Sequence, residues 1–224
     1  MMDDLKGKRF VASYSGGKDS MLAIHKAVGS GLEPMGLLTA YNADRLSSWF
    51  HGMSEELLHC VSQSLEIPLD LIITTGTEYA ENFEKALVTA KQKGAQVCVF
   101  GDIDIDGHLQ WCTERCEKTG LIPYFPLWGL NRKEAVFEFI DCGYCAIIKI
   151  VDTTVLPEDF LGRTLCRQTV SDIERLGADI CGENGEYHTF VYDGPLFKKA
   201  ICFETKEKMI RDKYAMLQHI TLQN

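Results

Sequence analysis

Apolar runs alternate with amphipathic stretches through the first half of the chain. Each apolar run is short, and in the stretch behind it the apolar side chains recur every three or four positions, which predicts a strand followed by a helix. Strands that alternate with helices are typical of βαβ units and a parallel sheet. We expect strands at residues 9–14, 35–41, 69–74 and 96–100, and helices at residues 19–28, 54–65, 79–93 and 109–119.

The pattern changes near Leu127. Pro123 and Pro126 indicate the end of a strand and a rigid extended connection, because proline cannot donate to a sheet. Beyond them we expect a helix from the cap Asn131 to about residue 142, a turn with a helix within residues 156–177, and strands at residues 145–151, 187–192 and 200–206. The chain therefore divides into an α/β domain, residues 1–126, and a smaller α+β domain, residues 127–224.

Composition and charge narrow the class of protein. With 46% hydrophobic and 25% charged residues, a chain of 224 residues can bury a large core. Its longest run without a charge, residues 119–131, holds two prolines and is shorter than the about 20 apolar residues of a membrane-spanning helix. The first residues carry acids and no apolar segment, so no secretory signal is expected. The net charge of −9 disfavours binding to nucleic acid or anionic lipid. We therefore expect a cytoplasmic protein that binds neither membrane nor nucleic acid.

Nine cysteines suggest free, buried thiols, since an odd number in a long chain does not resemble a disulfide framework. Cys142 and Cys145 have the spacing of a redox pair or half of a zinc site, and Cys112 and Cys116 have helical spacing. A zinc site needs a second pair of ligands, and the sequence offers no matching one. Metal binding by these cysteines is therefore not expected.

The most specific motif directly follows the first predicted strand and opens the first predicted helix: Ser15-Gly16-Gly17-Lys18-Asp19-Ser20. Two glycines let the backbone approach a phosphate chain, and the helix N-terminus offers free N–H groups and partial positive charge. Lys18 adds a full positive charge, and Asp19 can hold a magnesium ion. An ordinary glycine-rich turn with a solvated lysine is the alternative. The spacing fits neither a Walker A loop nor a dinucleotide fingerprint.

Two further segments carry candidate chemistry. Gly101 and Asp102 follow the fourth predicted strand, at the end where open α/β sheets bind ligands, although Asp102 could also simply cap a helix. Residues 182–190, Gly-Glu-Asn-Gly-Glu-Tyr-His-Thr-Phe, place Glu183 and Glu186 three positions apart beside glycines. Such a pair suits general-base catalysis or contact with a cationic substrate. The alternative is a polar hairpin loop without a catalytic or binding role.

The motif at residues 15–20 resembles the PP-loop of ATP pyrophosphatases in the adenine nucleotide alpha-hydrolase superfamily. The resemblance implies a HUP-type fold, a doubly wound parallel sheet that binds ATP and Mg²⁺. It also implies cleavage between the α and β phosphates, which makes an adenylate and releases pyrophosphate. On this basis the candidate nucleotide-binding residues are Ser13, Ser15, Gly16, Gly17, Lys18, Asp19, Ser20 and Gly101, with Asp19 as metal ligand.

Most of the chain is similar to the diphthine–ammonia ligase family. The similarity includes the PP-loop, residues 101–103, 126–128 and 160–162, and above all residues 182–197. It implies an ATP-dependent ligase that adenylates an acceptor carboxylate, on a small molecule or a protein, and amidates it with ammonia. It also implies assembly as a homodimer. Catalytic roles fall to Lys18, Asp102, Glu183 and Glu186, and acceptor binding to Glu183, Asn184, Glu186 and His188.

The acid-rich block departs from the family pattern Glu-Gly-Gly-Glu-aromatic-Glu-Thr. Asn184 stands where the first glycine is usual, and His188 where the last glutamate is usual. The block resembles the bacterial branch of the family, in which diphthine on an elongation factor is not expected as acceptor. Loss of a negative charge at His188 favours an acceptor that is less cationic than the trimethylammonium-bearing diphthine.

Two other functions stay open at this point. A thiolating or tRNA-modifying PP-loop enzyme would use a cysteine pair such as Cys142 and Cys145. A sensor would bind ATP without turning it over, and would not need the acidic block. His51 could contact the nucleotide or the acceptor, or be a plain loop residue, and Trp111 and Trp128 could line a pocket or belong to the core.

Overall fold

The computed structural model describes residues 5–205, 207–217 and 220–222. The chain forms two compact units. The first unit contains the residues up to Ser15, Asp19–Trp49 and Met53–Leu130, and the second contains Gly16–Lys18, Phe50–Gly52 and the residues from Asn131 onwards. The second unit thus includes two short segments from the N-terminal half, the middle of the PP-loop-like motif and the loop around His51.

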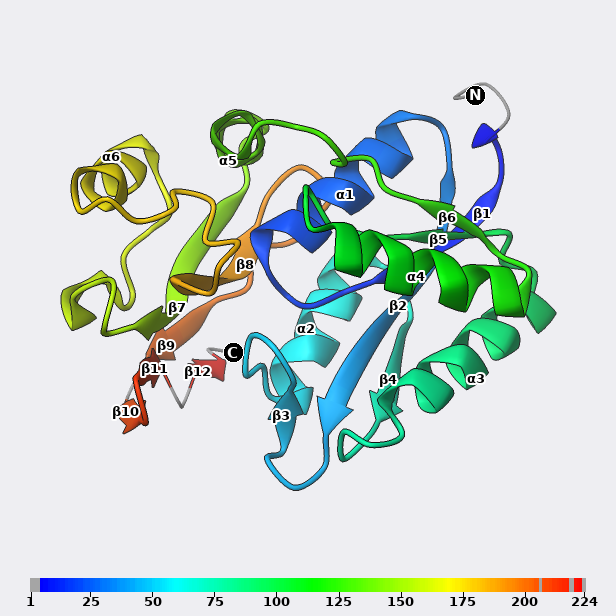
Figure 1. Ribbon diagram of the computed structural model, residues 1–224, viewed down its shortest axis with the longest axis horizontal. Coiled ribbons are helices and arrows are strands. Elements are labelled where there is room, and N and C mark those ends of the chain that lie inside the picture. The colour runs from blue at the N-terminus through cyan, green and yellow to red at the C-terminus, as the bar shows by residue number, and fades with distance from the viewer. Residues whose placement is uncertain (1–4, 206, 218–219, 223–224) are drawn as a thin grey trace. The chain divides into compact units, whose positions relative to one another are not determined.

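A parallel sheet forms the centre of the first unit (Figure 1). Its strands are β1 (Arg9–Ser13), β2 (Glu33–Asn42), β4 (Leu69–Ile73), β5 (Val97–Val99) and β6 (Ile122–Tyr124), with the short β3 (Ser47–Ser48) antiparallel to the end of β2. β1 lies between β2 and β5, β2 also pairs with β4, and β5 pairs with β6. The chain builds outward from β1 in one direction and then in the other, so the predicted doubly wound sheet is confirmed.

Helices cover both faces of this sheet: α1 (Lys18–Gly29), α2 (Glu55–Leu65), α3 (Tyr79–Gln92) and α4 (Asp106–Thr119). α3 and α4 lie on one side and α1 and α2 on the other (Figure 1), as right-handed crossovers require. The face under α3 and α4 holds a core that includes Phe83, Leu87, Phe100 and Cys116. The predicted cap of α2 is correct, because the Ser54 hydroxyl accepts a hydrogen bond from the Leu57 amide.

Two expectations about helix α4 and the cysteines need correction. α4 begins at Asp106, before the expected residue 109, because its first turn is polar and shows no periodic pattern of apolar residues.

All nine cysteines are free, as expected, but only those at 98, 112, 116 and 181 are buried. Cys142 and Cys145 are half-buried because they lie at the end of a helix and the start of a strand, where side chains reach solvent.

The second unit is α+β. β7 (Cys145–Asp152) and β8 (Tyr187–Asp193) are antiparallel neighbours in a sheet of order β10-β11-β7-β8. The remaining elements are β9 (Phe203–Thr205), β10 (Lys208–Arg211), β11 (Tyr214–Leu217), β12 (Ile220–Leu222), α5 (Arg132–Asp141), α6 (Arg167–Arg175) and the 3₁₀ turn η2 (Glu158–Phe160). The strand expected at 200–206 is shorter than predicted, and Lys206 lies outside the described residues. β3, β10, β11 and β12 were not predicted from the sequence.

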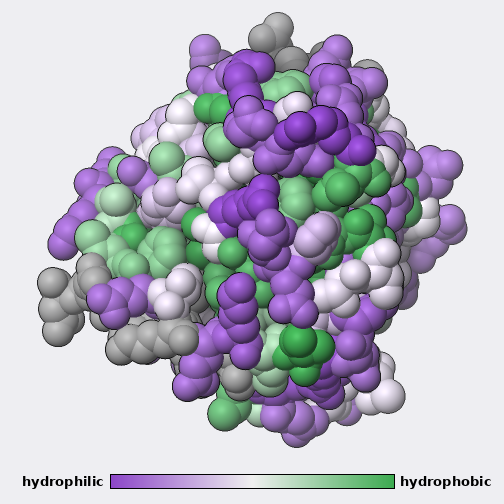
Figure 2. Space-filling model, turned by 90° about the vertical axis from the view of Figure 1, so that its left-hand side faces the viewer, coloured by the Kyte–Doolittle hydropathy of each residue, from purple (hydrophilic) through white to green (hydrophobic). Residues whose placement is uncertain are grey.

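The surface carries mixed polarity. Hydrophilic side chains cover much of the face shown in Figure 2, with smaller hydrophobic areas between them. Large exposed apolar side chains, such as Leu46, Ile73 and Ile210, come from separate elements, which is normal for protein surfaces. Among the described residues, no helix is both long and apolar enough to cross a membrane.

Candidate active site

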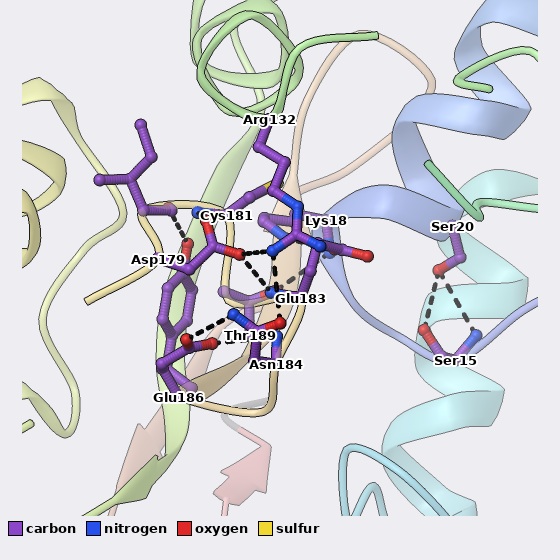
Figure 3. Close-up of polar contacts among 12 residues, drawn as sticks. Ser15, Lys18, Ser20, Arg132, Asp179, Cys181, Glu183, Asn184, Glu186 and Thr189 are labelled. Atoms are coloured by element: carbon purple, nitrogen blue, oxygen red, sulfur yellow. Dashed lines mark hydrogen bonds and ion pairs between the residues drawn. The ribbon is translucent and has the colours of Figure 1, made fainter. Parts of the chain in front are cut away.

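The PP-loop-like motif is a tight connection between β1 and α1. β1 ends at Ser13 and α1 begins at Lys18, so the four intervening residues turn the chain onto the helix N-terminus. The Ser20 hydroxyl of the first helical turn accepts from the Ser15 amide at 3.4 Å and lies 3.2 Å from the Ser15 hydroxyl (Figure 3). The turn thus lies at the N-terminus of α1, where the helix dipole attracts an anion.

Gly101 allows the end of β5 to approach this turn closely. A Cβ atom at residue 101 would lie 2.8 Å from the carbonyl carbon of Asp19 and 2.8 Å from the Ser20 amide nitrogen. These are backbone atoms of helix α1 and cannot rotate away. Only glycine fits here, and β1 and β5 therefore meet at the point where the doubly wound sheet changes direction, the usual ligand site of this fold.

Gly101→Ala is expected to lower the free energy of unfolding by about 1–3 kcal/mol, because the methyl group forces the first turn of α1 to shift. Urea denaturation would measure this change, and ATP binding should weaken with it. Gly107→Ala is the matched control: a Cβ there meets nothing within 4 Å, inside the first turn of α4. Equal stability of the two variants would contradict the close approach.

Asp102 lies beside the motif in the first unit. One carboxylate oxygen is 3.1 Å from His108 Nδ1, and the other is 3.9 Å from the Cys112 thiol, which donates to it. Burial raises the pKa of Asp102, His108 opposes that rise, and the charge of Asp19 adds to it. Two neighbouring carboxylates repel each other unless a proton or a cation lies between them. Their oxygens are the donors that Mg²⁺ prefers, so these residues fit the expected ion.

In the second unit, the middle of the motif contacts strand β8. The Gly16 carbonyl accepts from the Val191 amide at 3.2 Å, and the Lys18 amide donates to the Thr189 hydroxyl at 3.0 Å. The Lys18 ammonium is 3.9 Å from a Glu183 carboxylate oxygen and 5.7 Å from the centre of the Tyr187 ring. Lys18 is only 4% exposed. Lys18 of the motif and the acid-rich block therefore belong to one constellation.

A polar network shapes the acid-rich block (Figure 3). Arg132 Nη1, at the start of α5, forms a short ion pair with Asp179, and Asp179 also accepts from the Cys181 and Glu183 amides. The Asn184 amide and side chain donate to the two oxygens of Glu186, which is buried. Glu183 is thus presented to Lys18, whereas Glu186 is held within its own loop.

Two histidines and a lysine lie beside this constellation. His51 Nδ1 is 2.7 Å from the Thr189 carbonyl, and its ring meets that of His188 edge-on at 4.9 Å. Burial, followed by the charges of Lys18 and Lys149, lowers the pKa of His188 to about 4. Burial and the neighbouring His188 hold the pKa of His51 well below its usual value. Both rings are therefore neutral near pH 7.

The structure places the predicted residues in two groups. In the first unit, Ser15 and Ser20 hydrogen-bond, and Asp19 and Asp102 are close enough to influence each other's charge. Ser13 ends β1 and pairs with Leu38 of β2. In the second unit, Lys18, Glu183 and His188 lie around β8. Trp111 packs against Tyr79 and Phe83, and Trp128 against Phe125, so both belong to aromatic clusters of the first unit.

Three residues that take part in these contacts escaped the sequence analysis: Arg132, Lys149 and Asp179. Each is a common residue in an unremarkable local pattern, and its role depends on contacts with distant parts of the chain. A buried lysine inside an apolar strand was the one available signal, since lysine is almost never buried without a partner.

Relatives of known function are similar to nearly the whole length of the chain. Diphthine–ammonia ligase of Rattus norvegicus is 28% identical over 96% of this chain and 90% of the relative. Diphthine–ammonia ligase of Homo sapiens is 26% identical over 95% of this chain and 90% of the relative. A solved structure, described as a predicted subunit of tRNA methyltransferase from Methanocaldococcus jannaschii DSM, is 15% identical, with a TM-score of 0.46 over 86% of this chain and 100% of that one.

Family models match both halves of the chain. Residues 8–123 match the diphthamide synthase N-terminal domain, and residues 131–221 match the diphthamide synthase C-terminal domain. The first match includes the PP-loop and Asp102, and the second includes the acid-rich block with its two glutamates and His188. The chain therefore belongs to the diphthamide synthase family.

Proposed function

We propose that this protein is an ATP-dependent amide-forming ligase, which adenylates an acceptor carboxylate and amidates it with ammonia. The observation that carries the proposal is the contact between the PP-loop and the acid-rich block: Lys18 faces Glu183, and its amide is bound by Thr189 of β8. An ATP sensor needs only the loop. A ligase needs an acceptor site beside it, and relatives along the whole chain are named diphthine–ammonia ligases.

The nucleotide half of the reaction follows from the loop. An acceptor carboxylate oxygen attacks the α-phosphorus of ATP, the bond to the β-phosphate oxygen breaks, and pyrophosphate leaves. Lys18 and the positive end of the α1 helix dipole stabilise the negative charge that builds on the departing pyrophosphate. Asp19, together with Asp102, would hold Mg²⁺, which supplies further positive charge to the phosphate oxygens.

The second half forms the amide. Ammonia attacks the carbonyl carbon of the adenylate, AMP leaves, and the nitrogen loses a proton. Glu186 is our candidate for the base, because two hydrogen bonds from Asn184 fix its carboxylate while lone pairs remain on both oxygens. Glu183, beside Lys18, is suited to orient the acceptor or ammonia at the phosphate end of the site.

The other two functions receive less support. The relatives are not thiolating enzymes by name, and Cys142 and Cys145 are free thiols at the edge of α5 and β7. Free cysteines throughout the chain fit a cytoplasmic, reducing setting. The family resemblance is the sole support for a homodimer.

The test is to incubate the protein with ATP, Mg²⁺ and ammonium, with and without a small-molecule extract of the source cells, and to identify the nucleotide products. We expect AMP and pyrophosphate to form only with the extract. ADP and phosphate would contradict cleavage between the α and β phosphates. Tight ATP binding without turnover, in the presence of extract and of cell protein, would favour a sensor.

The acceptor is expected to be less cationic than diphthine. His188 is neutral at pH 7, so it brings no negative charge to attract a quaternary ammonium group. His188→Glu should shift acceptor preference towards cationic carboxylates by about tenfold, since a charge pair in a buried site contributes on the order of 1–3 kcal/mol. Competition between betaine-like and neutral carboxylates for AMP release would measure this. Unchanged preference would contradict the role of His188.

A further inference from the structure

Lys149 is a buried cation in the second unit without a charged partner among the described residues. Its side chain is 3% exposed, and its ammonium makes one hydrogen bond there, to the Gly52 carbonyl at 2.8 Å. An ammonium group has three donors, and a buried charge is costly unless it is paired. Burial accordingly lowers the pKa of Lys149 to about 8. None of the described residues neutralises this buried cation.

The backbone aims Lys149 towards the histidines. In the pairing of β7 with β8, Ile148 faces Thr189 and Ile150 faces His188, so Lys149 is the extra residue of a β-bulge. Bulges re-aim side chains and are frequent beside active sites. Gly52, in a left-handed conformation at φ +59°, turns its carbonyl to the ammonium and follows His51 directly. Lys149 contributes to the lowered pKa values of both His51 and His188.

The neighbours of Lys149 leave its charge available to a ligand. The two imidazoles are neutral and offer nitrogen atoms for hydrogen bonds, and His188 and His51 are both partly exposed to solvent. Glu183 faces Lys18, and both oxygens of Glu186 accept from Asn184. A ligand anion at this position would receive charge-assisted hydrogen bonds from an ammonium that has few other partners.

We propose that Lys149, flanked by His51 and His188, is an anion subsite that binds a carboxylate of the acceptor. This subsite depends on the proposed ligase function, because that function requires an acceptor. The acceptor is then a molecule that presents a carboxylate, and not a quaternary ammonium group, to strand β7. A phosphate of ATP is the other source of an anion, and the experiment separates the two.

The test follows the Lys149 side chain directly by NMR, in full-length protein with isotope-labelled lysine. Its signal is assigned by its disappearance in Lys149→Met. Glutarate is the carboxylate probe, tetramethylammonium the cation probe, and α,β-methylene ATP with Mg²⁺ the phosphate probe. We expect a saturable shift with glutarate in the presence of the nucleotide analogue, and none with tetramethylammonium. His188→Glu should weaken glutarate binding at least tenfold, because its carboxylate would pair with Lys149.

The same variants test structure and nucleotide binding separately. Lys149→Met should keep the thermal midpoint unchanged or raise it, since it removes a buried charge that has no charged partner among the residues the structure describes. It should bind the ATP analogue within twofold of wild type. Lys85→Met, at an exposed position of α3, is the matched control. The subsite would be overturned if the Lys149 signal shifted with the ATP analogue but not with glutarate. It would also be overturned if none of the probes shifted the signal. Failure of the ligase function would appear independently, in the nucleotide products.

Discussion

Lys18→Met is expected to lower the rate of AMP release by about 10²–10³-fold, the usual effect of losing one charge-stabilising donor in an active site. Methionine keeps an apolar stem of similar length and removes the ammonium, which lies 5.7 Å from the centre of the Tyr187 ring. Because negative charge builds on the departing pyrophosphate, kcat should fall more than the affinity for ATP. Steady-state kinetics with the extract-derived acceptor, together with calorimetric titration of ATP, would separate the two effects.

The control for this variant is Lys85→Met, which removes an exposed ammonium that pairs with Glu81 along α3. It should retain full activity. A Lys18→Met enzyme with wild-type kcat would contradict the role of the lysine at the phosphate chain. A variant that loses ATP affinity while kcat stays unchanged would indicate that Lys18 binds ATP equally in the ground and transition states, without assisting the departure of pyrophosphate.

The free energy of unfolding is expected to fall by about 3 kcal/mol or more between pH 6.5 and pH 4. The pKa of His188 is lowered from 6.5 to about 4 by burial and by the charges of Lys18 and Lys149, with Glu186 opposing. The pKa of His51 is lowered as well. The unfolded chain therefore takes up protons first as the pH falls. This stability is fully present above pH 6.5 and is lost as the pH falls towards 4.

Urea denaturation at successive pH values would measure this loss. A His51→Gln, His188→Gln double variant should flatten the curve between pH 6.5 and about 4.5, above the range in which ordinary carboxylates titrate. His59→Gln, on an exposed site of α2, is the matched control. If the double variant follows the same pH curve as the wild type, the two imidazoles are not held neutral by the fold.

Local signals identified the parts of the site that lie within one short stretch of chain. The motif at residues 15–20 was recognised because a glycine-rich turn, a lysine and a helix start must be contiguous to hold a phosphate chain. The cap Ser54 was found for the same reason, since a capping side chain bonds an amide three residues ahead. The first turn of α4 was missed because its polar residues show no helical periodicity of apolar positions.

Contacts between distant residues could not be inferred in the same way. His51 reaches the carbonyl of Thr189 across 138 residues, and Lys149 reaches that of Gly52 across 97. Glu183 and Glu186 look equivalent in the sequence, three positions apart. In the folded protein they differ: Glu183 forms an ion pair with Lys18, and Glu186 accepts hydrogen bonds from Asn184.

The order of apolar and polar residues thus sufficed for the alternating strands and helices, and the motif sufficed for the phosphate loop, because both depend on neighbours along the chain. Folding decided which carboxylate faces Lys18 and which histidines are neutral. It also decided that Lys149 lies buried at a bulge, with no counter-charge in the described part of the chain. These properties depend on burial and on charges brought together from distant segments. They arise only when β7 and β8 pair and residues 16–18 and 50–52 pack within the second unit.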